Sequence, residues 1–352
     1  MLSLLVRRIR YSLFVLLGVV TVVFFLFNVL PGDPARLVMG QRGNAATLEN
    51  ARREMNLDKP LHIRYLLYVN DILPLSIHKH DVKTQEKYKY ARLLPLPGDR
   101  ALVLKWPYLG RSYHSKREVN RVLAEALPGT VILALASMLI ATVGGILLGI
   151  VAALKKGTWM DSSAIAASVA GISMPSFFAG LIIAYVFGYL LHDVTGLSMT
   201  GSLWEYDAFK GRYFAPQHLI LPALALGIRP LAIITQLTRS ALLDVLSQDY
   251  IRTAYAKGLS RSKVVFRHAL PNAMNPVVTA ISGWLAELLA GSFFVEYIFG
   301  FKGVGRVTVD ALDKFDFPLV MGSVLLTAFI FIVISLLTDL VYGWLDPRVR
   351  YD

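Results

Sequence analysis

Six runs of roughly twenty apolar residues constrain this chain more than any other feature of its sequence. The first run, residues 11–30, carries no charged residue. Lipid offers no partner to an unpaired backbone amide or carbonyl, so such runs cross a bilayer as helices. The other runs occupy residues 126–154, 162–191, 219–237, 276–297 and 319–337. The sequence therefore predicts an all-α membrane protein with six transmembrane helices.

The composition supports this class and excludes others. Charged residues make up 17% of the chain, against about 25% in soluble domains. The net charge of +12 is scattered among loops without a DNA-reading motif, so we expect contact with anionic lipid and no nucleic-acid partner. The chain has no cysteine, which excludes a disulfide framework, a thiolate nucleophile and thiolate metal sites.

The basic residues also predict the topology. Arg7, Arg8 and Arg10 precede the first run, which is too long for the core of a signal peptide. We interpret 1–30 as a cytoplasmic N-terminus and an uncleaved first transmembrane helix. Both termini are then cytoplasmic, because the segment 238–275 and the tail 346–352 are rich in Lys and Arg. The core of five further helices is expected over 126–345.

The long segment 31–125 then lies outside the cytoplasm. It exceeds the length of a connector, so we expect a small extracytoplasmic subdomain with a helical stretch over 47–69 and a flexible or strand-forming insertion near 72–105. His78 and His80 alternate as on one face of a strand. Two histidines without further ligands do not make a metal site, so none is predicted.

Two features inside the runs bear on helix packing. Gly145 and Gly149 form a G-x-x-x-G pattern, which lets two helix backbones approach closely. Pro175 interrupts the third run near its middle and frees a carbonyl group. A structural kink is the simpler interpretation, and a kink that lines a substrate path is the alternative.

The stretch DYIRTAYAKGLSRSKVVFRHALP, residues 249–271, is short and basic between two apolar runs. Ser247 is a suitable N-cap and Gly258 a suitable C′ residue, so a helix is predicted over 248–257. Ser260 is expected to cap a second helix that ends at Pro271.

One face of the predicted 248–257 helix carries Ile251, Ala254 and Tyr255 at i, i+3 and i+4. A helix this short is not stable alone in water and has to pack against something. The alternatives are an anionic lipid surface and a groove on a partner protein. Lipid-bound helices usually carry Trp, Phe or Leu on the apolar face, so small residues with tyrosine favour the protein partner.

The stretch resembles the cytoplasmic "EAA" loop of ABC importer permeases, whose pattern is E-A-A, three residues, Gly, nine residues and I-x-L-P. Arg252-Thr253-Ala254 stands at the E-A-A position, followed at the expected spacing by Gly258 and by His268-Ala269-Leu270-Pro271. The form DYIRTAYAKGL is similar to the dipeptide/oligopeptide/nickel branch, as are LPGDP, LGRSY, LTRSALLDVLSQDY, LLAGSFFVEYIF and DLVYGWLDPRVRY. The resemblance is to the B-type permease and omits only about residues 72–105. Lys302 departs from it, since a proline is usual there.

This resemblance implies an inner-membrane permease subunit of the type I ABC importer class in a bacterial cytoplasmic membrane. Its expected partners are a second permease in a heterodimer, two ABC ATPase subunits that bind ATP and Mg, and an extracytoplasmic solute-binding protein. The chain itself is expected to bind no cofactor and to be no enzyme. The residues implied in coupling to the ATPase are Tyr250, Ile251, Arg252, Thr253, Ala254, Tyr255, Lys257, Gly258, Leu259, Leu270 and Pro271.

Peptides are the expected cargo, and nickel or another small solute is the alternative. Ionisable residues within spans are often functional, so Arg229 and Glu287 are candidates for the substrate pathway together with Pro175. The other interpretation of Arg229 and Glu287 is that they pair with each other, pair with a neighbouring permease, or lie near the interface. No G-x-x-x-x-G-K-[ST] motif occurs, so the chain is not the ATPase. An ion-coupled secondary transporter is the alternative from another class.

Overall fold

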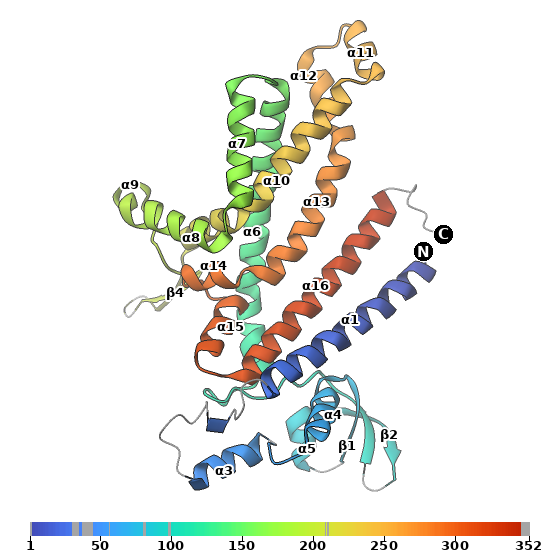
Figure 1. Ribbon diagram of the computed structural model, residues 1–352, viewed down its shortest axis with the longest axis vertical. Helices are drawn as coiled ribbons and strands as arrows, with labels where there is room; N and C mark the ends of the chain where they lie inside the picture. The colour runs from blue at the N-terminus through green and yellow to red at the C-terminus, as the bar shows by residue number, and fades with distance from the viewer. Residues whose placement is uncertain are drawn as a thin grey trace. The chain divides into compact units, whose positions relative to one another are not determined.

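The computed structural model describes residues 2–29, 35–36, 45–55, 57–79, 82–97, 100–207, 209 and 211–345. The chain forms two compact units. The core unit comprises Met1–Leu5, Ala126–Arg306 and Ile330–Asp352, and the sheet unit comprises Val6–Glu125 and Val307–Phe329. Long helices dominate the described part of the chain (Figure 1).

Five described helices are long and apolar enough to cross a membrane, and a sixth span results if one bent pair is counted. This confirms the predicted fold class. The five helices are Val6–Asn28, Val119–Leu154, Pro216–Leu246, Arg261–Ala290 and Phe317–Leu340, and the bent pair is Trp159–Ser173 with Ser176–Leu190.

The core unit begins in α6 (Val119–Leu154) and continues through α7 (Trp159–Ser173), α8 (Ser176–Tyr185), the π-helical η2 (Val186–Leu190) and α9 (His192–Thr195). A hairpin of β4 (Trp204–Asp207) and β5 (Gly211–Phe214) precedes η3 (Pro216–Leu219) and α10 (Ile220–Leu246). The unit then contains α11 (Asp249–Ala256), α12 (Arg261–Lys263), the π-helical η4 (Val264–Ala269), α13 (Leu270–Gly291) and α14 (Phe293–Ile298). α15 (Val304–Asp313) and α16 (Phe317–Leu345) each continue from one unit into the other.

The core of this unit lies where α10 packs against its neighbours. Leu221, Leu226 and Ile234 of α10 are almost fully buried, together with Leu133 of α6 and Val277 of α13. The predicted glycine contact is confirmed on the same helix. A Cβ atom at Gly145 would lie 2.8 Å from Cβ of Ile234, so only glycine lets α6 and α10 approach this closely.

Two of the predicted spans differ in the structure from the sequence prediction. The third span is not merely kinked at Pro175, because α7 and α8 are bent by 110°. Met174 and Pro175 both adopt extended backbone conformations between them, as the missing N–H of proline favours. The fifth span ends earlier than predicted, since α13 stops at Gly291 and α14 begins as a separate helix after Ser292.

The sheet unit contains α1 (Leu2–Asn28) from Val6 onward, α3 (Ala45–Glu54), α4 (Leu61–Ile72) and α5 (Val82–Tyr88). Its three-stranded antiparallel sheet has the order β1 (Leu75–Lys79), β3 (Arg100–Leu104), β2 (Ala91–Leu96). The segment for which the sequence allowed strands therefore forms a sheet. Ala101 and Val103 of the central strand are fully buried.

Candidate functional site

α11 lies at the end of the α10 and α13 helices in the core unit (Figure 1). Its N-cap is Gln248, which has extended backbone angles. The predicted N-cap, Ser247, is wrong because that residue closes α10 in a helical conformation. Its hydroxyl donates a hydrogen bond to the Asp244 carbonyl at 2.7 Å, so it satisfies the preceding helix rather than the following one.

In the structure, only part of the predicted apolar face of α11 is buried. Ile251 is 1% exposed and Ala254 is 7% exposed. Both belong to a buried cluster of this chain that includes Ile150 of α6, Leu242 of α10 and Val264 of η4. A face buried inside the chain is not available to a partner, so this part of the docking prediction is corrected. Ile251 and Ala254 attach α11 to the spans.

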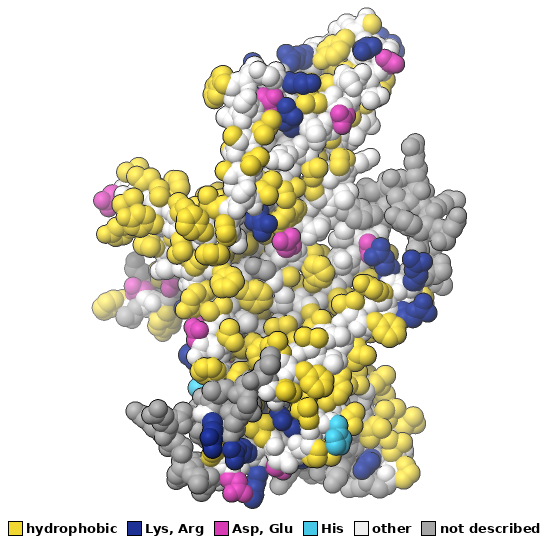
Figure 2. Space-filling view, in the orientation of Figure 1, with side chains coloured by type: hydrophobic (Ala, Val, Ile, Leu, Met, Phe, Trp, Pro, Cys, Tyr) yellow, Lys and Arg dark blue, Asp and Glu magenta, His cyan; other side chains and the backbone are white. Residues whose placement is uncertain are grey.

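The rest of the α11 surface, including Tyr255 of the predicted apolar face, is exposed and carries polar, basic and tyrosine side chains. Tyr250 is 45% exposed and Tyr255 43% exposed, and Arg252, Thr253 and Lys257 are exposed beside them. Lys and Arg side chains gather at this end of the core unit in Figure 2. Arg252 pairs with Asp249 at 3.4 Å in full contact with water, which leaves its guanidinium free to exchange partners.

Gly258 ends this helix as predicted. Its φ of +77° lies in the left-handed region, where glycine carries no steric cost. Its amide donates to the Tyr255 carbonyl at 2.9 Å, and the Leu259 amide reaches the Ala254 carbonyl at 3.4 Å. No atom of the described residues lies within 4 Å of the position of a Cβ atom at Gly258. A side chain there would strain the backbone but would meet open space.

Ser260 begins the next helix as predicted, with extended angles at its N-cap position. Pro271 does not end that helix, which corrects the prediction. The chain passes through the π-helical η4 directly into α13, with Pro271 in the first turn of α13. A π-helical segment changes the hydrogen-bond spacing, and proline is tolerated in a first turn because its missing N–H is not needed there. Leu270 is half-buried and Pro271 is exposed.

An ion pair that the sequence analysis did not identify lies near this end of the spans. Arg239 of α10 binds Asp161 of α7 through two hydrogen bonds, Nε to Oδ1 at 2.5 Å and a terminal nitrogen to Oδ2 at 2.8 Å. The Gly157 amide also donates to Oδ2 of Asp161 at 2.9 Å. Asp161 is only 4% exposed. This pair fastens α7 to α10, and its sequence signal is an acidic residue in the first turn of a span helix.

The three candidates for a substrate pathway do not form one cluster of contacts. Pro175 is the N-cap of α8. Arg229 of α10 has a buried Nε atom without a hydrogen-bond partner, and its guanidinium carbon lies 5.7 Å from the ring centre of Trp284 in α13. Glu287 is exposed one turn after Trp284. Within the described residues, no ion pair joins Arg229 to Glu287, so the predicted alternative of mutual pairing is not seen.

Glu296 is a second functional candidate that the sequence analysis missed. Its side chain is fully buried and accepts hydrogen bonds from the hydroxyls of Thr130 at 2.7 Å and Ser292 at 2.6 Å. The Arg306 amide also donates to it at 3.2 Å. Burial raises the pKa of Glu296. A Cβ atom at Gly305 would lie 2.9 Å from this carboxylate, so the surrounding turn fits closely around it.

Lys302, the position that departs from the permease pattern, lies in the same turn. Its backbone amide donates to the Ser202 hydroxyl at 3.1 Å. Proline has no N–H and cannot make this bond. Its ammonium reaches the Trp204 carbonyl at 3.3 Å. The lysine therefore joins the turn to the β4–β5 hairpin.

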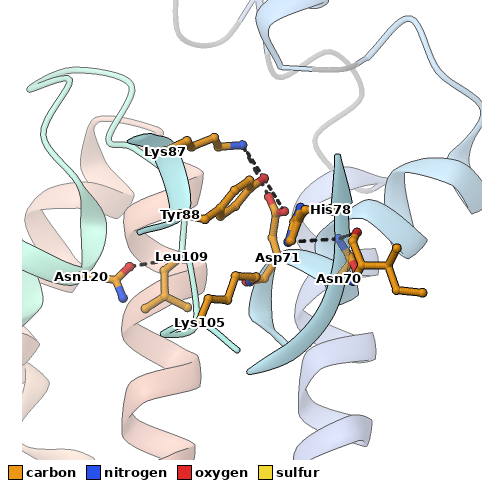
Figure 3. A network of polar contacts seen from close by, with 9 residues as sticks. Asn70, Asp71, His78, Lys87, Tyr88, Lys105, Leu109 and Asn120 are labelled. Atoms are coloured by element: carbon orange, nitrogen blue, oxygen red, sulfur yellow. Dashed lines mark hydrogen bonds and ion pairs between the residues drawn. The ribbon is translucent and has the colours of Figure 1, made fainter. Parts of the chain in front are cut away.

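His78 is part of a polar and aromatic network in the sheet unit (Figure 3). It is 8% exposed, and its ring centre lies 4.2 Å from that of Tyr88. Burial lowers the pKa of His78, which keeps the imidazole neutral. His80 and Asp81, the other members of the considered metal motif, lie outside the described residues.

Comparisons with known proteins match both halves of the chain to one family of membrane proteins. The family described as "Binding-protein-dependent transport system inner membrane component" matches residues 145–351, and its N-terminal domain matches residues 1–85. The di/tripeptide transport system permease protein DppB of Pseudomonas aeruginosa is 35% identical over 369 residues, covering 100% of both chains. The glutathione transport system permease protein GsiC of Salmonella paratyphi A is 34% identical, also covering 100% of both chains.

Two further matches complete the comparison. The dipeptide transport system permease protein DppB of Escherichia coli K12 is 34% identical and covers 100% of this chain and 99% of its own. A solved chain of the MetNI methionine ABC transporter in an inward-facing conformation covers 64% of this chain with a TM-score of 0.49 and 16% identity. Because the family description spans more than half of the chain and the relatives match it from end to end, the chain belongs to the family of binding-protein-dependent transport system inner membrane components.

Proposed function

We propose that this permease moves short peptides through the cytoplasmic membrane as one subunit of an ATP-driven ABC importer. Relatives at 34–35% identity over the full length are permeases for dipeptides, tripeptides and glutathione, which supports peptide cargo. The permease works with a second permease in a heterodimer, two ATPase subunits and a solute-binding protein. ATP and Mg are bound by the ATPase subunits.

The observation that carries this proposal is the two-sided character of α11. Its buried face, Ile251 and Ala254, is fixed to the spans, and its exposed face offers two tyrosines and basic side chains. Such a helix suits a groove on a cytoplasmic ATPase, with Tyr250, Arg252, Thr253, Tyr255 and Lys257 as the contacting residues. Gly258, Leu259, Leu270 and Pro271 position the helix.

The packing also suggests how movement of the ATPase reaches the membrane. α11 is joined directly to α10, and the helical segment from Arg261 to Ala290 begins only a short turn later. Its anchor residues touch the ends of α6 and α10 and the start of the next span. A displacement of α11 therefore moves the three spans that its anchor residues contact. ATP binding and hydrolysis in the ATPase subunits use this movement to open the transport pathway to one side of the membrane and then to the other.

The topology follows from this role. Both termini and the segment 238–275 are cytoplasmic, and the subdomain 31–125 is extracytoplasmic, where it receives the solute-binding protein. The pathway through the spans is lined near Pro175, Arg229 and Glu287. Arg229 meets the carboxylate of a passing peptide and Glu287 its ammonium, since both are ionisable groups within a span. Nickel import and ion-gradient-driven transport are the competing functions.

The proposal is tested with the purified permease pair and its ATPase subunits in lipid vesicles. Gly258→Trp places a side chain at a φ of +77°, and Arg252→Glu reverses a charge on the exposed face of α11. Both variants are expected to reduce recovery of the ATPase in a pull-down and to abolish stimulation of ATP hydrolysis by peptide-loaded binding protein. Arg53→Glu, an exposed arginine of α3 outside the cytoplasm, is the matched control for the pull-down and is expected to recover the ATPase as wild type does.

The outcomes separate the functions. Full stimulation in both α11 variants would contradict the role of this helix in coupling. A wild-type permease that neither binds the ATPase nor responds to it would contradict ATP-driven import altogether, and uptake driven by an imposed ion gradient would then support the secondary transporter. If nickel-loaded binding protein stimulates ATP hydrolysis and peptide-loaded binding protein does not, the cargo is nickel and not peptide.

A further inference from the structure

A cavity of about 570 Å³ lies within the sheet unit and has no role in the proposed coupling. One face of α4 forms a wall of this cavity with Arg64, Tyr68 and Asp71. These residues follow the i, i+4, i+7 pattern, so they lie in a row along the helix. Arg111 and Lys116 add two further cations to the lining. The cavity therefore has charges of both signs, with the cations in excess.

The Arg64 end of the row lacks an anion. Its guanidinium donates to the amide oxygen of Asn28 at 2.5 Å. In the described part of the chain no carboxylate forms an ion pair with Arg64, and its burial lowers its pKa. The hydroxyl of Tyr68 is buried there without a hydrogen-bond partner. A half-buried guanidinium and a buried hydroxyl without a partner together present donors that a carboxylate would satisfy.

The Asp71 end already holds an ammonium group. The Nζ atom of Lys87 lies 4.5 Å from the ring centre of Tyr88 and 4.8 Å from that of Tyr108. It donates to the Tyr88 hydroxyl at 2.7 Å and lies 4.0 Å from Oδ2 of Asp71. Figure 3 shows Lys87 and Tyr88 directed toward Asp71. Two aromatic rings and a carboxylate are the groups that recognise a cationic nitrogen. The side chain of Lys87 is 45% exposed, so it is free to move away.

The separation of the two ends sets the size of a ligand. Arg64 and Asp71 are seven positions apart in α4, which corresponds to about 10 Å along the helix axis. An extended peptide spans at most about 3.3–3.6 Å per residue. Two or three residues with free termini therefore match the distance between the guanidinium end and the ammonium end.

We propose that this cavity binds a small zwitterion, a peptide of two or three residues, with its carboxylate at Arg64 and its ammonium at Asp71, Tyr88 and Tyr108. This rests on the proposed function, which places the sheet unit outside the cytoplasm and makes peptides the cargo. The Lys87 ammonium occupies the place of the ligand ammonium when the cavity is empty. Binding of a peptide displaces it, so Lys87 competes with the ligand.

The test measures equilibrium binding of L-alanyl-L-alanine to the full-length permease in dodecyl maltoside micelles, whose headgroups carry no charge, without the ATPase. N-acetylated and C-terminally amidated dialanine are the two probes that each lack one charge. Asp71→Asn is expected to weaken dialanine binding at least tenfold and to leave the N-acetylated probe unchanged. Arg64→Gln is expected to weaken dialanine and to leave the amidated probe unchanged.

A third variant distinguishes the loss of a binding site from misfolding of the permease. Lys87→Met removes the competing ammonium, so it is expected to tighten dialanine binding several-fold, an effect that a damaged fold does not produce. Arg121→Gln, an exposed arginine of α6, is the matched control and is expected to change nothing. Dialanine binding that is absent in wild type, or equal in wild type and all three cavity variants, overturns the proposal.

Two further arms identify the ligand and separate this proposal from the proposed function. A phosphatidylethanolamine headgroup is also a zwitterion. If nanodiscs of that lipid abolish the dialanine binding of the wild-type permease, the headgroup is the occupant and the peptide proposal is overturned. If ATP-driven peptide uptake is normal in the reconstituted importer but binding ignores the cavity variants, the proposed function stands and this site fails. If the cavity variants change dialanine binding but the importer shows no ATP-driven peptide uptake, the proposed site stands and the proposed function fails.

Discussion

The close contact between α6 and α10 predicts how the stability of the permease changes when a glycine at this contact gains a Cβ atom. A Cβ atom at Gly149 would lie 2.5 Å from Cβ of Thr238 and 2.8 Å from the carbonyl oxygen of Thr235. Both neighbours belong to the rigid part of α10 and are not the ends of flexible side chains. We therefore expect Gly149→Ala to destabilise the permease by forcing the two helices apart.

The magnitude follows from the distances. Ordinary contacts of a Cβ atom lie at 3.4–4 Å, so α6 and α10 have to separate by roughly 1 Å, and such overpacking costs about 1–3 kcal/mol. Gly283 of α13 is the matched control, because no atom lies within 4 Å of its Cβ position. In an open helical position alanine is favoured over glycine by up to about 1 kcal/mol. The same substitution is therefore expected to have opposite signs at the two positions.

The assay is thermal unfolding of both purified variants and wild type in the same nanodiscs at one scan rate, since unfolding of such a protein is commonly irreversible. At about 2–4 °C per kcal/mol, Gly149→Ala is expected to lower the transition by several degrees. Gly283→Ala is expected to leave it unchanged or raise it slightly. Equal shifts in the two variants, or a gain in stability for Gly149→Ala, would refute the close approach of α6 and α10.

Three further predictions concern the attachment of α11, the α7–α10 ion pair and the sheet unit. Ile251→Ala is expected to cost about 2–4 kcal/mol, because Ile251 is 1% exposed, and to speed hydrogen exchange in α11, whereas Tyr255→Ala is not. In a double-mutant cycle, Asp161→Asn with Arg239→Gln is expected to lose less stability than the sum of the single variants, since each alone leaves a charge without its partner; additive losses would contradict the pairing. Burial lowers the pKa of Lys105 to about 8, so the unfolded chain binds its proton more tightly. Unfolding then takes up a proton, and stability is expected to rise from about pH 8 to about pH 10.5, where the unfolded lysine also loses its proton, a rise that Lys105→Met removes.

Much of the site was predictable from local sequence. The turn at Gly258 and the start of the following helix at Ser260 were predicted correctly, because left-handed glycines and helix caps are local conformational preferences. The N-cap of α11 was not, since Ser247 and Gln248 are both polar and only the continuation of α10 decides which helix Ser247 serves. The same applies to Pro271, where a π-helical segment accommodates a residue that usually limits a helix.

The sequence by itself determined the class and the places of the long apolar helices, because a stretch of about 20 apolar residues satisfies its backbone in lipid by forming a helix. Only the tertiary structure decided which face of α11 is free, since Ile251 and Tyr255 share a helical face and differ only in what packs against them. It also brought Thr130 to Glu296 and Arg239 to Asp161, partners far apart in sequence. Pairings of this kind depend on how helices cross, which is set by the combined packing of many side chains and leaves no local pattern in the chain.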